Sequence, residues 1–508
     1  MCQPFLTCRR GNPIVPDRPP RRCRIKGMPL PTAFLLLSVV AAMLPTAAGG
    51  EEAGGGREGT PPNIVLIVAD DYGWTDTSTG RPNLGHGSKY YRTPNIDRLA
   101  CEGTSFTSAY TCGPNCAPTR ACLMSGLYTP RHGVYTVSSG ARGREKDRKL
   151  IPVKNRTTLD PSYVTLAEAL KAVGYTNVHL GKWHLGSPGQ AGPLEQGFDF
   201  NFGGNHSGSP RGGYFSPYKN PQLADGPKGE NLTDRLAEEA AGQIRRHRDR
   251  PFFIYLPFYA VHTPIQAKQE LKTEYAKRPA HGGHNNPAYA AMVETMDAGV
   301  GRVLDVLDEL KLTKNTLVIF TSDNGGLGGY KSIGLTKNKN ITDNAPLRGG
   351  KGCLYEGGVR VPMVVRYPGV AQPEGICHEP VITVDFYPTL AAVAKAKTPE
   401  QLDGENLLPL LRDPSAKLDR DALYWHFPGY LQAYGPGNWR TTPAGAIRAG
   451  KWKLIEFFED ERVELYNLDA DLGEQNDLAQ AEPDTRDRLH KMLRAWRDEV
   501  EAPMPRRK

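Results

Sequence analysis

Residues 110–133, YTCGPNCAPTRACLMSGLYTPRHG, hold the side chains with the clearest chemical potential in the chain. Cys116 is followed by Pro118 and Arg120, and the apolar segment 121–127 begins directly after them. Pro118 suits the first turn of a helix, where its missing N–H is not needed. The start of a helix and a nearby guanidinium both favour negative charge, which activates a thiol. Cys116 is therefore a candidate reactive thiol, and a buried small hydrophobic residue is the alternative.

Four apolar runs elsewhere in the chain each end in charged or amide side chains. Such continuous runs are typical of strands buried on both faces of a parallel sheet. The runs are residues 63–69, 176–180, 252–259 and 316–320, and the polar groups that follow them are Asp70 with Asp71, Lys182 with His184, His262, and Asp323 with Asn324. In an open α/β sheet the ligand crevice lies beyond the carboxyl ends of the strands. We therefore expect all four groups to meet at one site.

Carboxylate and amide oxygens make up two of these groups. Two adjacent carboxylates at the end of a buried strand, as at Asp70 and Asp71, are costly unless a cation or hydrogen-bond donors satisfy them. Together with Asp323 and Asn324, they offer the oxygen ligands that calcium or magnesium prefers. A helix N-cap or a solvated turn is the alternative for Asp70 and Asp71.

Basic side chains form the complementary set. Lys182 and His184 are two residues apart, so they share one face of an extended segment and suit an anionic group. Lys351 lies in the glycine-rich segment 346–352, where the backbone can approach a ligand closely. For Lys182 or His184 taken alone, a surface or satisfied core position is the alternative.

The elements that must position these residues indicate an α/β fold. Helical periodicity and helix end signals recur between the strands, at residues 94–103, 162–173, 287–310 and 385–394. A fifth strand is expected at 361–367. We predict a large central, mostly parallel sheet flanked by helices, within a catalytic domain at 61–418.

The pattern changes after about residue 419. Segments 446–458 and 463–468 indicate short antiparallel strands around a polar turn, and 481–500 indicates a charged amphipathic helix. Residues 419–508 are therefore predicted to form a small C-terminal α+β subdomain.

The N-terminus has the composition of a secretory signal. Seven basic residues precede an apolar run at 33–44, which is too short to span a membrane, and small residues follow at 45–49. We predict a signal peptide at 1–48 and a flexible mature N-terminus at 49–60. The protein is therefore expected to be exported, to the periplasm or the medium, or to the lysosome in a eukaryotic host.

Most of the net positive charge lies in that leader. Of the 63 basic and 55 acidic residues, seven basic and one acidic come before Gly49, which leaves 56 against 54 and a net charge of +2. A nucleic-acid-binding face needs clustered basic residues, so we expect no nucleic-acid partner. No run reaches the roughly 18 apolar residues of a membrane span, so none is expected in the mature chain.

Six motifs, taken together, resemble the type I sulfatases of the alkaline-phosphatase superfamily over nearly all of the chain after the leader. They are PNIVLIVADD, CAPTR, GKWHLG, VHTP, FTSDNGG and RGGKG, in this order. The resemblance implies that a formylglycine-generating enzyme reads the signature at Cys116 and oxidises that cysteine to formylglycine. Many relatives have serine at the fourth position of the signature, where this chain has Thr119 and keeps a hydroxyl.

The resemblance also assigns roles to the candidate site residues. It implies one calcium ion, held by Asp70, Asp71, Asp323, Asn324 and the modified Cys116. It implies that the formylglycine hydrate is stabilised by Arg120 and that the sulfate oxygens are bound by Lys182 and Lys351. The expected activity is hydrolysis of a sulfate ester on a sulfated carbohydrate.

In the implied reaction, the hydrated aldehyde supplies two hydroxyls on one carbon. One of them, whose proton Asp323 takes, attacks sulfur and displaces the alcohol, which His262 protonates. The other, deprotonated by His184, restores the aldehyde and releases sulfate. The cation, Lys182 and Lys351 offset the charge that develops on the sulfate oxygens.

Two other functions remain open from the sequence. One is a phosphatase or phosphodiesterase of the same superfamily, and the other is a non-catalytic binder of sulfated glycans in which Cys116 stays unmodified. Two glycine-rich insertions, 203–218 and 325–344, are expected to be long loops over the crevice. The candidate sugar contacts in the first insertion are His206, Arg211 and Tyr214.

Overall fold

The computed structural model describes residues 61–335 and 340–508, and all of these lie within one compact unit. The predicted signal peptide at 1–48 and the predicted flexible segment at 49–60 lie outside the described residues. Within the described ranges, no helix is both long and apolar enough to cross a membrane.

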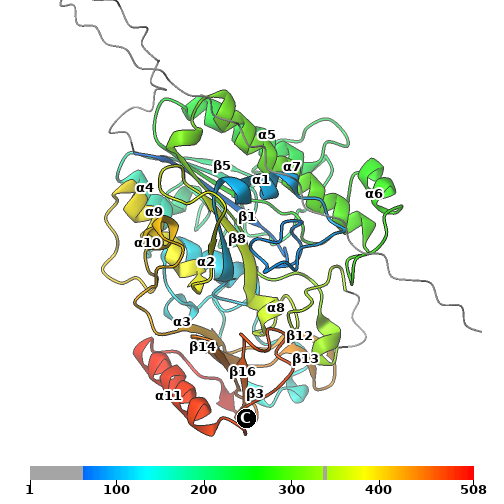
Figure 1. Cartoon of the computed structure of the whole chain (residues 1–508), viewed down its shortest axis with the longest axis vertical. Coiled ribbons are helices and arrows are strands. Elements are labelled where there is room, and N and C mark those ends of the chain that lie inside the picture. Colours follow the sequence, from blue (N-terminus) through cyan, green and yellow to red (C-terminus); the bar gives the residue numbers. More distant parts are fainter. Residues whose placement is uncertain (1–60, 336–339) are drawn as a thin grey trace, which may run out of the picture. The chain divides into compact units, whose positions relative to one another are not determined.

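A large central sheet organises the described chain (Figure 1). Its strands follow the order β10-β2-β8-β7-β1-β6-β4-β5, with β9 paired to β2. They are β1 Asn63–Ala69, β2 Thr104–Tyr110, β4 Thr176–Leu180, β5 Phe200–Phe202, β6 Phe252–Pro257, β7 Thr316–Ser322, β8 Arg360–Arg366, β9 Gly375–Cys377 and β10 Val381–Ile382. Strands β7, β1, β6, β4 and β5 pair in parallel, while β8 runs antiparallel to β7 and β2. The mostly parallel sheet predicted from the apolar runs is confirmed.

Helices cover both faces of this sheet, which explains why its central strands are apolar without alternation. Val65 and Ile67 of β1 pack in the hydrophobic cluster that also holds side chains of α1, α5 and α7. Ile64 and Leu66 pack in the opposite cluster, with α2, α4, α9 and α10. These helices are α1 Pro94–Glu102, α2 Cys116–Ser125, α4 Leu166–Lys171, α5 Leu232–His247, α7 Pro287–Glu309, α9 Phe386–Ala394 and α10 Leu408–Arg412.

Two local differences from the sequence prediction have clear causes. The helix expected at 162–173 is only α4, because Thr165 and Glu168 form a capping box that starts the helix there. Strand β2 was not predicted, because its sequence TSFTSAY mixes hydroxyl and apolar side chains although all seven residues are buried. Burial on both faces therefore does not always leave a continuous apolar run.

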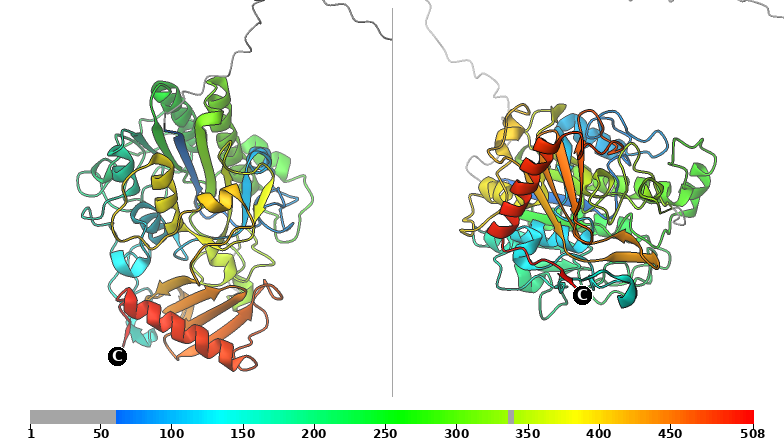
Figure 2. Two further views of the ribbon diagram at one scale, coloured as in Figure 1. Left: turned by 60° about the vertical axis from the view of Figure 1, so that its left-hand side comes forward. Right: turned by 90° about the horizontal axis from the view of Figure 1, so that it is seen from below.

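A second, antiparallel sheet lies in the C-terminal part, in the order β11-β14-β15-β16, and α11 packs on it (Figure 2). Its elements are β11 Leu423–Phe427, β14 Ala444–Ala449, β15 Trp452–Phe457, β16 Arg462–Asn467 and α11 Pro483–Glu499. The α+β character is confirmed, but the segment 446–458 forms two strands rather than one, because the chain turns at Gly450, where φ is +56°. The boundary at residue 418 stays a prediction.

The remaining α-helices and strands of the described chain are short. They are α3 Thr129–His132, α6 Gln269–Tyr275, α8 Glu356–Val359, the hairpin of β12 Leu431–Gly435 with β13 Asn438–Thr441, and the pair of β3 Leu150–Ile151 with β17 Arg506–Arg507. The hairpin β12–β13 contributes to the wall of a cavity described below.

A buried ion network joins the C-terminal sheet to the segment that carries Lys351. The Nζ of Lys453 on β15 lies 2.9 Å from a carboxylate oxygen of Glu356 and 3.0 Å from one of Glu474, and all three side chains are 0% exposed. Burial raises the pKa of Glu474 to about 7. Burial also raises that of Glu356, but Lys453 and Arg360 outweigh it and bring the pKa down to about 2. The ammonium group therefore holds two buried carboxyl groups together.

We expect Lys453→Met to lower the free energy of unfolding by about 3–5 kcal/mol, because it leaves a buried charge without its partner. Urea unfolding followed by circular dichroism measures this change. The control is Lys417→Met, which removes an exposed lysine whose Nζ lies 2.8 Å from Glu379. A similar effect in both variants would contradict the role of the buried network.

Candidate active site

The four strand ends predicted to form a site lie next to one another in the sheet. Strands β7, β1, β6 and β4 are adjacent and parallel, so their carboxyl ends lie at one edge. Asp70 and Asp71 follow β1, Lys182 follows β4, and His262 follows β6 after a short connection. Asp323 follows β7 directly. The expected convergence of these segments is confirmed.

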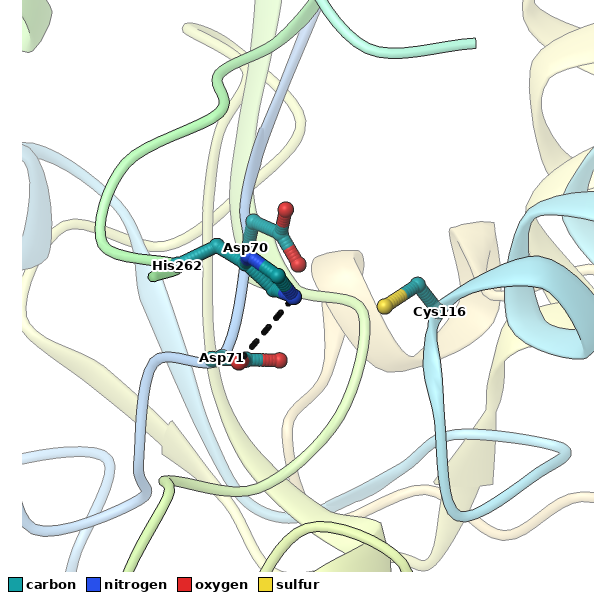
Figure 3. Close-up of side chains that lie close together, drawn as sticks. All are labelled: Asp70, Asp71, Cys116 and His262. Carbon is teal, nitrogen blue, oxygen red and sulfur yellow. Dashed lines mark ion pairs between the residues drawn. The ribbon is translucent and has the colours of Figure 1, made fainter. Parts of the chain in front are cut away.

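Cys116 opens the helix that faces this edge. It is the first residue of α2, which ends at Gly126 with φ +70°, a left-handed position that favours glycine. The Sγ of Cys116 forms one group with Asp70, Asp71 and His262, in which the ligand atoms all lie within 4.8 Å of one another (Figure 3). The Nε2 of His262 is 3.8 Å from the Oδ2 of Asp71. Two strand ends, those of β1 and β6, and one helix start thus supply a single cluster.

Two lysines contact the carboxylates of this cluster. The Nζ of Lys182 is 2.6 Å from the Oδ2 of Asp70, and both side chains are 0% exposed. The Nζ of Lys351 is 2.6 Å from the Oδ1 of Asp71 and 3.6 Å from the Sγ of Cys116. Both predicted anion-binding lysines therefore lie at the predicted site, each next to an aspartate.

Arg120 and Asp323 form a separate buried pair beside the cluster. The Nη2 and Nε of Arg120 donate to the Oδ2 of Asp323 at 2.6 and 2.9 Å. The Nη1 of Arg120 donates to the backbone oxygen of Lys182 at 2.6 Å. The other carboxylate oxygen of Asp323 accepts from the backbone N–H of Asp71 at 3.3 Å. Asp323 thus lies at the site, but the group of four does not include it.

His184, two residues after Lys182, has a left-handed backbone conformation with φ +65°. Its Nδ1 is buried and has no hydrogen-bond partner among the described residues. Burial, followed by the charge of Lys182, holds its pKa well below the usual range. At pH 7 the imidazole is therefore neutral.

Burial and neighbouring charges together shift the pKa values of the other site residues. It raises the pKa of Asp70 to about 7, assisted by the charge of Asp323. It also raises that of Asp71, but Lys351 and His262 outweigh it, so the pKa of Asp71 lies below its usual range. Burial and the charge of Lys351 lower the pKa of His262 to about 3. Neighbouring carboxylates thus differ in their affinity for a proton.

The thiol of Cys116 is not activated, which corrects the prediction made from the helix start. Burial raises its pKa to about 12, although Lys182 and Lys351 act in the opposite direction. Arg120 does not change this, because its guanidinium is paired with Asp323. An unmodified Cys116 is therefore protonated at neutral pH and a weak nucleophile.

Three buried oxygens at the site have no hydrogen-bond partner among the described residues. They are Asp70 Oδ1, Asp71 Oδ2 and Asn324 Oδ1. The amide Nδ2 of Asn324 donates to the other oxygen of Asp71 at 2.9 Å. Buried oxygens without donors are costly, and a hard cation such as calcium is bound by such oxygens. The donor set at this site therefore fits calcium.

The glycine-rich segment 203–218 is a loop that lies against the site, as its Gly208 would contact the His184 ring if it carried a Cβ. His206 and Arg211 are exposed on it, and their ring and guanidinium nitrogens are 3.3 Å apart. Tyr214 is 1% exposed, and its hydroxyl donates to the backbone oxygens of Tyr259 and His262. Its prediction as a sugar contact is wrong, because this side chain anchors the backbone that carries His262.

Asp76 is a positioning residue that the sequence analysis missed. Its carboxylate accepts from Tyr289 Oη at 2.6 Å, Thr342 Oγ1 at 2.7 Å and the backbone N–H of Gly73 at 2.8 Å. These bonds join the segment after β1 to Tyr289 on α7 and to Thr342, near the end of the insertion 325–344. Loop aspartates are common, so the sequence held no signal for this role.

Comparisons with known proteins agree with this geometry. The family model described as Sulfatase matches residues 62–396, and the model described as N-sulphoglucosamine sulphohydrolase, C-terminal, matches residues 350–499. A protein named Sulfatase from Formosa agariphila is 37% identical over 515 residues, which cover 87% of this chain and 90% of the relative. The Steryl-sulfatase of Mus musculus is 32% identical, and the match covers 82% of this chain and 78% of the relative.

The fold is also found among solved structures. That of Ps i-CgsB in complex with k-i-k-neocarrahexaose has a TM-score of 0.69 and 30% sequence identity, and the match covers 86% of this chain and 93% of that one. The family model spans the strands β1, β4, β6 and β7 as well as α2. The chain therefore belongs to the sulfatase family of the alkaline-phosphatase superfamily and is a sulfuric ester hydrolase.

Proposed function

We propose that this sulfatase hydrolyses sulfate esters of a carbohydrate, using a formylglycine formed from Cys116 and one calcium ion. The observation that carries the proposal is the position of Cys116 at the start of α2, among the charged ends of β1, β4 and β6 and beside Lys351. The raised pKa of the thiol adds support, because an unmodified Cys116 would be a poor nucleophile at neutral pH. A hydrated aldehyde at this position supplies a hydroxyl nucleophile instead.

We assign the calcium ligands to the oxygens of Asp70, Asp71, Asp323 and Asn324 together with the modified Cys116. The buried oxygens without partners on Asp70, Asp71 and Asn324 support this assignment. Calcium would supply positive charge to the sulfate oxygens. Asp323 lies beside these residues, where its carboxylate forms a buried ion pair with Arg120.

The basic residues would bind the sulfate group and the modified side chain. Lys182 contacts Asp70 and Lys351 contacts Asp71, and each can hydrogen-bond a sulfate oxygen with an N–H that its aspartate does not occupy. Arg120 lies one helical turn after Cys116. Its guanidinium would stabilise the hydroxyls of the formylglycine hydrate formed from Cys116. Their charge offsets the charge that develops on the sulfate oxygens during ester cleavage.

Proton transfers would fall to Asp323 and the two histidines. Asp323 takes a proton from the attacking hydroxyl. His262 donates one from Nε2 to the leaving alcohol, and a bound sulfate anion favours its protonated form by raising its low pKa. His184, neutral at pH 7, accepts the proton that must leave before sulfate is released.

A carbohydrate is favoured as the substrate because the loop beside His184 is polar. His206 and Arg211 are exposed there and can hydrogen-bond sugar hydroxyls or charged groups. The solved relative Ps i-CgsB holds a neocarrahexaose, which is consistent with this class. The match to sulfatases over most of the chain favours this activity over a phosphatase or phosphodiesterase. We favour catalysis over mere glycan binding, because every implied catalytic position is occupied.

Maturation and location form part of the same proposal. Export rests on the composition of residues 1–48, and modification of Cys116 requires a formylglycine-generating enzyme as a partner. We place the catalytic domain at 61–418 and the smaller subdomain at 419–508, with the Lys453 network joining them.

Cys116→Ala should abolish sulfate release, because it removes the side chain that becomes the nucleophile. In unaltered protein from its native host, the peptide spanning Cys116 should have the mass of an aldehyde rather than a thiol. Mass spectrometry and a sulfate-release assay check both points. Cys122→Ala is the control, since Cys122 is buried on the same helix and should not be needed for sulfate release. Full activity of Cys116→Ala would refute the proposal.

His262→Ala should lower kcat on a sugar sulfate by about 100-fold to 10,000-fold, the usual contribution of a general acid. The loss should be much smaller on 4-nitrophenyl sulfate, whose leaving group needs no proton. His378→Ala, which changes an exposed histidine after β9, is the control. An equal loss on both substrates would show that His262 does not act as the acid.

Calcium should stabilise the folded protein after treatment with a chelator. A free calcium concentration of 100 times Kd should add about 2.7 kcal/mol, measured as a rise in Tm. Asn324→Ala should reduce this rise by removing an oxygen ligand, whereas Asn476→Ala, at an exposed loop position, should retain it. If calcium left the Tm of the unaltered protein unchanged, the calcium assignment would be wrong.

A further inference from the structure

A cavity of about 350 Å³ lies between the loop that carries Lys351 and the C-terminal sheet. Its walls come from residues 348–355, from the hairpin β12–β13 with the residues after it, and from β15 and β16. This volume is within the range of pockets that bind small ligands. None of the roles proposed above uses this cavity.

Positive charge predominates in the cavity. Three arginines, Arg348, Arg440 and Arg462, line it together with one carboxylate, Glu464. Arg462 contacts Glu464 directly, and the Nη1 of Arg348 is 4.0 Å from it. The single carboxylate therefore serves two of the arginines, and the lining carries a net charge of about +2.

Arg440 is the arginine that remains available to an anion. Among the described residues it has no carboxylate partner within ion-pair distance. Its guanidinium lies 4.5 Å from the centre of the Tyr330 ring, and its Nε donates to the Tyr434 hydroxyl at 3.0 Å. These contacts hold the planar group in place but leave its charge unpaired. A held guanidinium with spare donors is well suited to a sulfate or carboxylate.

The cavity is joined closely to the proposed active site. Cys353, which lines it, is two residues from Lys351, or roughly 7 Å along the chain. The Tyr330 hydroxyl donates to the backbone oxygen of Lys351 at 3.1 Å, so one tyrosine contacts both Arg440 and the Lys351 backbone. A ligand in the cavity would thus lie near one whose sulfate reaches Lys351.

Aromatic side chains complete the lining. Trp439, Tyr355 and Phe457 provide apolar surface beside the guanidinium groups. Apolar rings with a few fixed charged groups are typical of sites that recognise amphipathic ligands, including the faces of sugar rings. The cavity therefore combines recognition of a ring with recognition of an anion.

We propose that this cavity is a subsite for a second anionic group of the substrate, carried by the sugar next to the one whose ester is cleaved, with Arg440 as its main ligand. The anion is a sulfate or a carboxylate. This inference rests on the proposed function and defines its substrate class as a polyanionic oligosaccharide. Residues of the C-terminal subdomain thereby select substrates for a reaction carried out by the central sheet.

The test compares three disaccharides that carry the same cleavable sulfate ester, identified first by a desulfation screen. Their neighbouring sugars are neutral, sulfated or a uronic acid. The unaltered enzyme should show a kcat/KM about 10-fold to 100-fold higher for a charged neighbour than for the neutral one, since hydrogen bonds to charged groups contribute about 1.5–3 kcal/mol. Preference for one charged disaccharide identifies the anion, and preference for both also supports the subsite.

Arg440→Gln should bring the ratio of kcat/KM between charged and neutral substrates close to one, and Arg440→Lys should retain part of it. Arg302→Gln, on α7 and paired with Glu238, is the control and should keep the full ratio. If thermal unfolding shows that Arg440→Gln is not folded, Arg462→Gln provides the test. The side chain of Arg462 is 48% exposed and lines the same cavity. That variant should also reduce the ratio.

The outcomes separate the subsite from the function on which it rests. If the unaltered enzyme releases no sulfate from any carbohydrate ester, the proposed function fails. If it releases sulfate but shows no preference for a charged neighbour, the subsite is refuted. The same holds if the preference persists in Arg440→Gln, or in Arg462→Gln where that variant replaces it.

Discussion

Asp70 and Asp71 place two carboxyl groups, 0% and 1% exposed, at the end of the central strand β1. Removing each charge from water costs several kcal/mol, which nearby positive charge and hydrogen-bond donors offset. That charge comes from Lys182 after β4 and Lys351 in a distant loop, with Arg120 on α2 acting through Asp323. The site thus requires these segments to be held together, and the parallel sheet holds those of β1, β4 and β7 in register.

The same positive charge would explain binding of a sulfate group. Lys182 and Lys351 each contact one aspartate, so their remaining N–H donors can bind an anion placed beside Cys116. A cation among the oxygens of Asp70, Asp71 and Asn324 would add to this charge. Stabilisation of the site and recognition of the substrate would therefore depend on one set of electrostatic interactions.

The C-terminal sheet contributes to the site through the loop between Arg348 and Glu356. Lys453 of β15 holds Glu356 at one end of this loop, and Arg348 at the other end donates to Tyr466 of β16 at 2.9 Å. Lys351 lies between these two anchors. Chain motion in the loop is therefore restrained on both sides of the lysine, and the arginine-lined cavity lies against the same segment.

The sequence by itself determined the sheet strands that carry the site, a helix whose first turn holds Pro118 and the identity of the charged side chains at the strand ends. These features are local, because they depend on apolar runs, proline position and short motifs. Only the tertiary structure decided the pairing of Arg120 with Asp323, the raised pKa of the Cys116 thiol, the buried position of Tyr214 and the cavity around Arg440. Each of these depends on which distant segments pack together and on how far their packing excludes water. Local sequence patterns do not show which distant segments will be in contact.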